Sequence, residues 1–198
     1  MIPRHFEIAM AVLFVGVLVL GYYVRHMRGR VKEAVRAVDS RPLAPPAAGP
    51  TEQVTLYVAH DDPGVLEAES ARIALSSGRQ ERAQELVQAL LARYLDRNST
   101  HTLPPRADVR DVYMVDTGLV VIDLNSAFAD GHRSGILVEE LTVASLGETL
   151  AANLPGINRV KFLVDGRQRD SLAGHADLSG YYDSAAISSL AQKLQQSP

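Results

Sequence analysis

The residues best suited to chemistry lie near the end of the chain, where one alanine separates His175 from Asp177. A histidine close to a carboxylate is a pairing that general acid–base catalysis and many metal sites use. The structural interpretation is that His175 bonds to nearby backbone in a loop, while Asp177 starts an Asx-type turn before Leu178 and Ser179. We favour that interpretation, because no second motif supports a site around the pair.

Other histidines that could serve a catalytic or metal site also fall in predicted loops: His60 (followed by Asp61 and Asp62), His101 and His132. A zinc site needs three or four ligands, usually with a short local spacing such as His-Glu-x-x-His, and no such motif occurs. The sequence also has no Gly-x-Ser-x-Gly elbow, no Ser-x-x-Lys with companion motifs and no phosphate-binding loop. We therefore expect no catalytic residue, no metal and no cofactor.

Two carboxylates occupy an unusual position on a predicted helix over residues 136–154. In a helical projection, Glu139 and Glu140 fall inside the arc of its apolar residues, and a carboxylate buried there without partners is costly. The structural interpretation, which we favour, places both in the first turns at the rim of the core, where the helix dipole favours negative charge. The functional hypothesis makes them partner-facing or ligand-facing acids, paired with Arg72 or Arg133. The candidate binding residues are Glu139, Glu140, Arg72, His175 and Asp177.

Composition narrows the class of protein. The 198 residues are 46% hydrophobic and 22% charged, which suits one globular domain with additional segments. Cysteine is absent, and this excludes disulfides, cysteine-rich zinc sites, thiol nucleophiles and cysteine lipidation. Residues 1–50 carry a net charge of +4, whereas residues 51–198 carry −7. An acidic domain without a Lys/Arg cluster lacks the electrostatic footprint of a nucleic-acid binder.

The N-terminal region predicts a membrane anchor. Residues 8–24 are uncharged, near the lower end of the roughly 17–25 residues that span a bilayer as a helix. Basic residues follow instead of a signal-peptidase site, so we favour an uncleaved span over a secretory signal. We divide the chain into an anchor with flanks (1–26), a basic then Pro/Ala-rich linker (27–51), a folded domain (52–183) and an amphipathic tail (184–198).

Hydrophobic periodicity predicts the elements of the domain. Alternating or apolar runs indicate strands, and apolar residues at helical spacing indicate helices. Ser77 is the expected cap of the first helix. The predicted fold is α+β and two-layered, with two main helices on one face of a small mixed, mostly antiparallel sheet. The predicted elements are strands at 54–58 and 65–75, a helix at 79–95, a hairpin at 109–115 and 119–125, a helix at 136–154, a strand at 160–164 and a docked or frayed tail helix at 184–195.

Several segments, in order, resemble the GerMN domain family over about residues 54–183. These are LPP at 103–105, DTGLVVIDLNSAF at 116–128, TL at 149–150, LPGI at 154–157, VKFLVDG at 160–166 and GHADLS at 174–179.

The resemblance implies a small α+β domain, comparable to the ring-building motifs of sporulation assemblies. It implies a membrane-anchored, extracytoplasmic location and a role in envelope or spore assembly. Some relatives are joined to peptidoglycan amidase domains, which implies a setting near the cell wall. The family has no established catalytic residues, so none is assigned. The chain departs from the family pattern in having one copy of the domain, a span in place of a lipoprotein cysteine, and basic residues after the span.

We therefore expect a non-enzymatic, membrane-tethered interaction or assembly module that binds an envelope protein, itself or peptidoglycan, and no nucleic acid. The alternative is a cell-wall-associated hydrolase or metal-dependent enzyme that uses His175 with Asp177 or Glu139. The resemblance argues for a soluble domain outside the cytoplasm, whereas the basic flank after the span argues for the cytoplasmic side by the positive-inside rule. Both topologies stay open at this point.

Overall fold

The computed structural model describes residues 49–115 and 118–195, which belong to one compact unit, Ala48–Pro198. The predicted membrane span at residues 8–24 and most of the predicted linker lie outside the described residues. Within the described ranges, every helix is too short or too polar to cross a bilayer.

A long β-hairpin forms the first part of the domain. Its strands are β1 (Thr51–His60) and β2 (Val65–Ala74), which pair antiparallel from Thr51 opposite Ala74 to His60 opposite Val65. Alternate residues of β1 point into the core, because successive side chains of a strand face opposite ways. Both strands are confirmed, including the second, for which the sequence pattern was ambiguous.

The second sheet is mixed. Its strands lie in the order β3 (Val109–Met114), β4 (Leu119–Leu124), β5 (Arg159–Val164) and β6 (Tyr182–Asp183). β4 and β5 are parallel and the other neighbours are antiparallel, so the expected mixed, mostly antiparallel pairing is confirmed. The expectation of one sheet is wrong, because the described strands form two separate sheets.

Two long helices and two shorter ones accompany the strands: α2 (Arg79–Tyr94), α3 (Ser126–Asp130), α4 (Ile136–Asn153) and α5 (Ser184–Gln195). The predicted apolar stripe of α2 is buried in full. Ser77 is not the cap of α2, because Gly78 takes that position and the Ser77 hydroxyl bonds the Glu81 carboxylate instead. The tail helix α5 is docked, since Ile187, Ala191 and Leu194 are buried.

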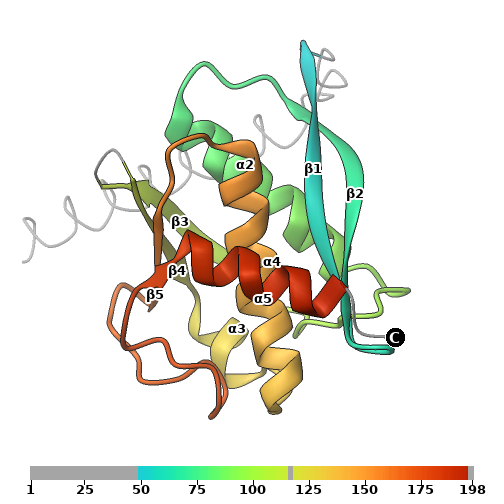
Figure 1. Ribbon diagram of the computed structural model, residues 1–198, viewed down its shortest axis with the longest axis vertical. Helices are drawn as coiled ribbons and strands as arrows, with labels where there is room; N and C mark the ends of the chain where they lie inside the picture. The colour runs from blue at the N-terminus through green and yellow to red at the C-terminus, as the bar shows by residue number, and fades with distance from the viewer. Residues whose placement is uncertain (1–48, 116–117, 196–198) are drawn as a thin grey trace, which may run out of the picture. The chain divides into compact units, whose positions relative to one another are not determined.

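One hydrophobic core joins both sheets and the helices. Leu56 of the hairpin, Leu90 of α2, Leu141 of α4 and Phe162 of β5 all belong to the same cluster of buried residues. Helix α4 runs alongside β1, and α5 crosses in front of α4 in the view of Figure 1. This continuous packing makes the two sheets parts of one α+β domain.

The edge of β1 that faces away from β2 is closed by side chains of α4. Thr55 donates its N–H to Asn153 Oδ1 (3.1 Å) and accepts from Asn153 Nδ2 (2.6 Å). Tyr57 donates its N–H to Thr149 Oγ1 (2.9 Å) and accepts from Ser145 Oγ (2.6 Å). A helix therefore satisfies backbone groups that a neighbouring strand would otherwise pair, which explains why β1 and β2 form a separate sheet.

Replacing Thr149 with valine keeps the shape of the side chain but removes the acceptor of the Tyr57 N–H. We expect Thr149→Val to lower the free energy of unfolding by about 1–2 kcal/mol, because a partly buried donor is left without a partner. Denaturant unfolding followed by circular dichroism measures the change. Thr149→Ser keeps the hydroxyl and is the matched control. Equal losses in the two variants would contradict the assigned role of the hydroxyl.

Candidate functional site

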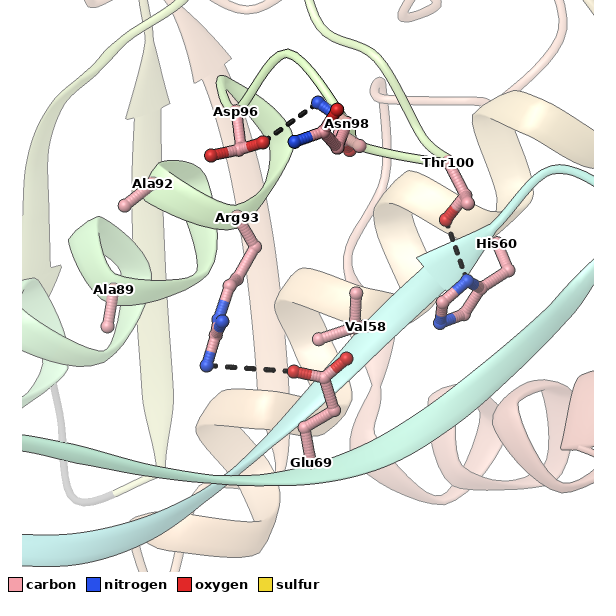
Figure 2. Close-up of a pocket in the computed structure, with 10 residues that line it drawn as sticks. Val58, His60, Glu69, Ala89, Ala92, Arg93, Asp96, Asn98 and Thr100 are labelled. Carbon is pink, nitrogen blue, oxygen red and sulfur yellow. Dashed lines mark hydrogen bonds and ion pairs between the residues drawn. The ribbon is translucent and has the colours of Figure 1, made fainter.

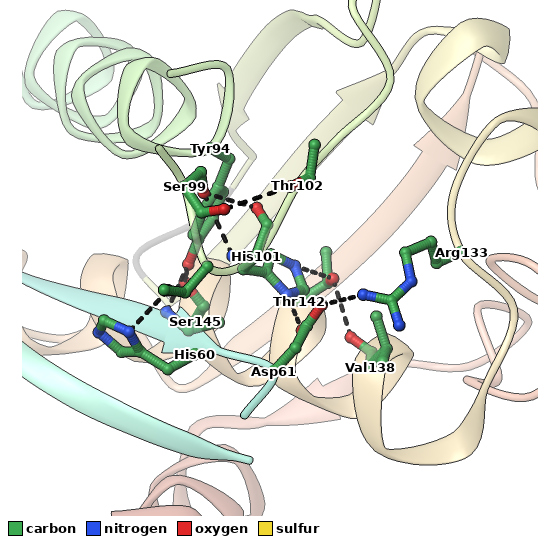
Figure 3. Close-up of polar contacts among 12 residues, drawn as sticks. His60, Asp61, Tyr94, Ser99, His101, Thr102, Arg133, Val138, Thr142 and Ser145 are labelled. Atoms are coloured by element: carbon green, nitrogen blue, oxygen red, sulfur yellow. Dashed lines mark hydrogen bonds and ion pairs between the residues drawn. The ribbon is translucent and has the colours of Figure 1, made fainter. Parts of the chain in front are cut away.

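Three segments far apart in sequence bring an acid, a histidine and a hydroxyl together (Figure 3). Asp61 Oδ1 lies 2.6 Å from Nδ1 of His101, and Nε2 of His101 lies 2.8 Å from Thr142 Oγ1. The chain Asp–His–Thr uses both ring nitrogens, as the relay of a hydrolytic triad does. The histidine loops, which the sequence could not place relative to one another, therefore do converge.

The surrounding elements determine this arrangement. Asp61 directly follows β1 at the hairpin turn, and its N–H donates to the Thr100 carbonyl at 3.3 Å. His101 lies in the loop after α2, where its N–H donates to Ser99 Oγ at 3.2 Å. Thr142 lies in the second turn of α4. The geometry thus depends on the hairpin and the loop after α2 both packing against one helix.

His132 and Arg133 complete the cluster from the loop before α4. His132 Nε2 lies 2.7 Å from Thr142 Oγ1, and its Nδ1 donates to the Arg133 carbonyl at 2.7 Å. The Arg133 guanidinium donates to Asp61 Oδ2 at 2.6 Å. Each oxygen of the Asp61 carboxylate therefore has a cationic or hydrogen-bonding partner.

The number of protons limits which hydrogen bonds can form inside the cluster. The Thr142 hydroxyl has one proton, so it can donate to only one of its three possible acceptors, the Val138 carbonyl and the Nε2 atoms of His101 and His132. Burial lowers the pKa of His132, and the neighbouring His101 adds to this lowering. A neutral His132 ring that donates from Nδ1 to the Arg133 carbonyl leaves Nε2 as an acceptor, so Nε2 and the Val138 carbonyl compete for the Thr142 proton.

The pKa of the Asp61 carboxyl is also shifted. Burial opposes its ionisation, but the hydrogen bond from His101 and the charges of His101 and Arg133 outweigh burial and lower its pKa. The carboxylate is thus held in its ionised form by the groups that it positions.

The cluster has the connectivity of a catalytic relay but no access for a substrate. Thr142 and His101 are each about 1% exposed, and His132 is 7% exposed. The Thr142 hydroxyl is further engaged by the Val138 carbonyl at 3.1 Å. A nucleophile must reach the substrate atom that it attacks. The arrangement therefore joins three segments of the fold rather than exposing a reactive oxygen. Across residues 49–115 and 118–195, no three His, Asp or Glu side chains are grouped to hold a metal ion.

A second polar cluster surrounds Glu139, in the first turn of α4. Its side chain is fully buried, and Oε2 accepts the N–H groups of Ala173, His175 and Ala176 at 2.9–3.0 Å. Oε1 lies 2.9 Å from Nδ1 of His175. Gly174 has φ of +121°, a conformation that favours glycine and turns these three N–H groups towards one oxygen. Glu139 therefore anchors the loop that carries the GHADLS segment.

The hydrogen bonds of Glu139 decide its charge. Burial alone would raise the pKa of the carboxyl, but the hydrogen bonds from the loop outweigh it and lower the pKa to about 2. The expected partners Arg72 and Arg133 do not contact Glu139 in the described structure, since its partners are the loop and Arg133 pairs with Asp61. The expectation that Glu139 lies at the rim of the core is wrong, because the loop covers the carboxylate completely.

The other predicted residues are not brought together into a site. Asp177 accepts the Ser179 N–H at 2.7 Å, so the predicted Asx-type turn is confirmed. His175 is 41% exposed and bonds Glu139 rather than backbone, and no contact joins it to Asp177. Ser134 Oγ lies 3.4 Å from the same Nδ1 that faces Glu139, so His175 does not link acid and hydroxyl through two nitrogens. Glu140 is half-buried on α4.

Arg72 lies apart from these residues, exposed on β2 opposite Gln53. Sequence reasoning found Glu139 but missed the uncharged polar residues of α4. Their signal was present, because Thr142, Ser145, Thr149 and Asn153 recur at helical spacing on an otherwise apolar helix. Polar residues that share one buried face of a helix must have partners elsewhere in the fold.

A groove of about 440 Å³ lies between the hairpin and α2 (Figure 2). Arg93 of α2 reaches across it to Glu69 of β2, with 3.7 Å between nitrogen and oxygen. At its other end His60 Nδ1 lies 2.6 Å from Thr100 Oγ1. Its lining residues are Val58, His60, Glu69, Ala89, Ala92, Arg93, Asp96, Asn98, Ser99 and Thr100.

Comparison with known proteins gives one family match. Residues 55–170 match the family model described as Germane, sporulation and spore germination. Among solved structures, a candidate lipoprotein from Clostridium perfringens is 22% identical, with a TM-score of 0.46 over 71% of this chain and 92% of that one. The tandem GerMN domains of the sporulation protein GerM from Bacillus subtilis are 19% identical, with a TM-score of 0.47 over 65% of this chain and 44% of that one. None of the curated proteins matches the sequence.

The Glu139 carboxylate stabilises the fold only while it is ionised. Because folding lowers its pKa from 4.5 to about 2, this stabilisation is complete above about pH 4.5 and is lost as the pH falls towards 2. Glu139→Gln should therefore be less stable than the wild type near neutral pH, and the difference should shrink as the pH falls through this window. Denaturant unfolding at a series of pH values measures it. Glu140→Gln is the control. A stability difference between Glu139→Gln and the wild type that stays constant with pH would contradict the assignment.

Proposed function

The chain belongs to the Germane family of sporulation and spore germination, as its GerMN resemblance predicted, and we propose that it is a non-enzymatic, membrane-tethered interaction module of the bacterial cell envelope. In this role the folded domain binds an envelope protein, a second copy of itself or peptidoglycan. Residues 8–24 tether the domain, and residues 49–195 supply the binding surfaces.

The observation that carries this proposal is the structural use of the two buried polar clusters, around Thr142 and around Glu139. The Thr142 hydroxyl is buried between two histidines and a carbonyl. The Glu139 carboxylate is covered by the loop that it binds. Polar groups used in this way connect segments of the fold. A partner molecule can therefore reach only the outer surfaces of the domain. The family match supports the same class of function, because it belongs to sporulation and germination rather than to an enzyme class.

The first test separates an interaction module from a wall hydrolase. The purified full chain in detergent is incubated with peptidoglycan sacculi, and soluble muropeptides are measured by chromatography. We expect no release above a buffer control, because the described Asp–His–Thr relay has no exposed hydroxyl. Muropeptide release that His175→Ala or Thr142→Val abolishes, in a variant with the wild-type circular dichroism spectrum, would replace the proposal with the hydrolase.

The second test concerns the side of the membrane. We propose that the domain lies outside the cytoplasm, as the family resemblance implies. An alkaline phosphatase fused after Pro198 should then be active, because this reporter folds only in an oxidising compartment. A cytoplasmic reporter fused at the same position is the matched control. An inactive phosphatase with an active cytoplasmic reporter would place the domain in the cytoplasm and contradict the envelope role.

A further inference from the structure

The outer edge of β2 has unpaired backbone groups. The N–H groups of Thr55 and Tyr57 point towards α4, away from β2. In an antiparallel pair, residues opposite such positions also point their backbone groups away from the partner strand. Ser70 lies opposite Thr55, and Ala68 lies opposite Tyr57. Backbone groups of Ala68, Ser70 and, by the same alternation, Arg72 therefore face outwards.

Across the described residues, this edge has no strand beside it, although α5 packs against β2. β1 is the only strand that pairs with β2, and no hydrogen bond occupies the outward backbone groups of Ala68, Ser70 or Arg72. The side chains of all three residues are exposed. Soluble proteins protect a long edge strand with proline, a bulge or charged side chains. β2 has neither proline nor a bulge, so its backbone groups stay available, while the charges of Glu67, Glu69 and Arg72 limit which strand can pair with it. A regular ten-residue edge of this kind is a template for one more strand.

The groove lies beside the same edge. Glu69 of β2 points towards α2, and α4 closes the opposite side of the hairpin at β1, so the groove opens on the β2 side. Its floor on α2 is made of Ala89 and Ala92, which leave room for side chains from above. An added strand would send alternate side chains down towards this floor, because strand side chains alternate between faces.

The charge of the groove determines which partner side chain can bind in it. Glu67 and Glu69 lie on the face of β2 that looks towards α2, and Asp96 lies at the groove wall. Arg93 is the one Lys or Arg that lines the groove, and its contact with Glu69 is long, at 3.7 Å. The site is therefore net negative with His60 neutral, which favours a cationic side chain.

We propose that the outer edge of β2 binds an extended segment of a partner protein as an added β-strand, with a Lys or Arg of that segment entering the groove beside Glu69. The backbone groups of the β2 edge form the hydrogen bonds to the partner, and the groove selects which partner side chain binds. The inference rests on the proposed function, because it identifies the surface and the chemical class of partner for that interaction module.

A second copy of the chain is a poor occupant of this site. If two β2 strands paired around a two-fold axis, residues opposite each other would have their side chains on the same face of the joined sheet. The residues of the second β2 directed into the groove would then include Glu67 and Glu69, next to the same carboxylates of the first copy. Like charges placed opposite each other destabilise strand pairing. The charge pattern of β2 thus favours a different chain.

Synthetic peptides test the inference directly. The probe is acetyl-Thr-Val-Thr-Lys-Thr-Val-Thr-amide with a fluorescent label, in which the two valines and the lysine share one face of an extended strand. Its matched control carries glutamate in place of lysine. Fluorescence anisotropy with the detergent-purified full chain should show binding of the lysine peptide, and about fivefold or more weaker binding of the glutamate peptide.

Variants of the protein locate the binding. Ser70→Pro removes an outward N–H without breaking a bond to β1, and should abolish binding of the lysine peptide. Ser70→Ala keeps that N–H and should bind as the wild type does. Glu69→Gln should bind both peptides with a smaller difference between them, which keeps the test valid if the proline variant misfolds. Circular dichroism of each variant monitors its folding.

Three outcomes would overturn the inference. The first is no binding of the lysine peptide up to about 1 mM. The second is binding that persists in a folded Ser70→Pro variant. The third is self-association of the full chain, measured by analytical ultracentrifugation, that Ser70→Pro abolishes, because the occupant would then be a second copy. None of these depends on muropeptide release or reporter activity, so failure of the strand site and failure of the proposed function are distinguishable.

Discussion

A single stripe of polar side chains along α4 holds the domain together. Glu139, Thr142, Ser145, Thr149 and Asn153 follow one another at intervals of three or four residues, so they share one side of a helix that is otherwise packed in the core. The first binds the GHADLS loop, the second binds two histidines, and the last three bind the edge of β1. The partners other than His132 are distant in sequence, so the stripe determines where three separate segments lie.

The same stripe explains why the domain contains a catalytic-looking relay. A buried hydroxyl needs partners, and histidine can offer a donor and an acceptor across a ring. Tyr94 shows the same use of a buried polar group, since it accepts the Ala59 N–H at 2.9 Å and donates to Ser145, which in turn donates to Tyr57. Burial raises the pKa of Tyr94, which keeps its hydroxyl protonated. Acid, histidine and hydroxyl meet here as buried partners that join three segments of the fold.

The two edges of the hairpin have different surroundings. Side chains from α4 satisfy the β1 edge, which lies inside the fold, whereas the β2 edge has no such cover among the described residues. This asymmetry leaves the domain closed on the side of its polar stripe and open on the side of the groove. Surfaces of that kind suit a protein that assembles with others.

The sequence by itself determined the local structure and the family. Alternation in β1, the apolar stripe of α2 and the turn residues after Leu154 depend on neighbours within a few positions, so periodicity was enough to predict them. The ordered GerMN motifs, from LPP at 103–105 to GHADLS at 174–179, likewise identified the family, whose model matches residues 55–170.

Only the tertiary structure decided which polar groups meet. Asp61, His101 and Thr142 are separated by about 40 residues at each step, and nothing local to any of them indicates the other two. The division into two sheets was equally hidden, because it follows from Asn153 and Thr149 taking the place of a neighbouring strand. Hydrogen bonds between distant segments depend on how the helices and strands pack, and hydrophobic periodicity carries no information about that pairing.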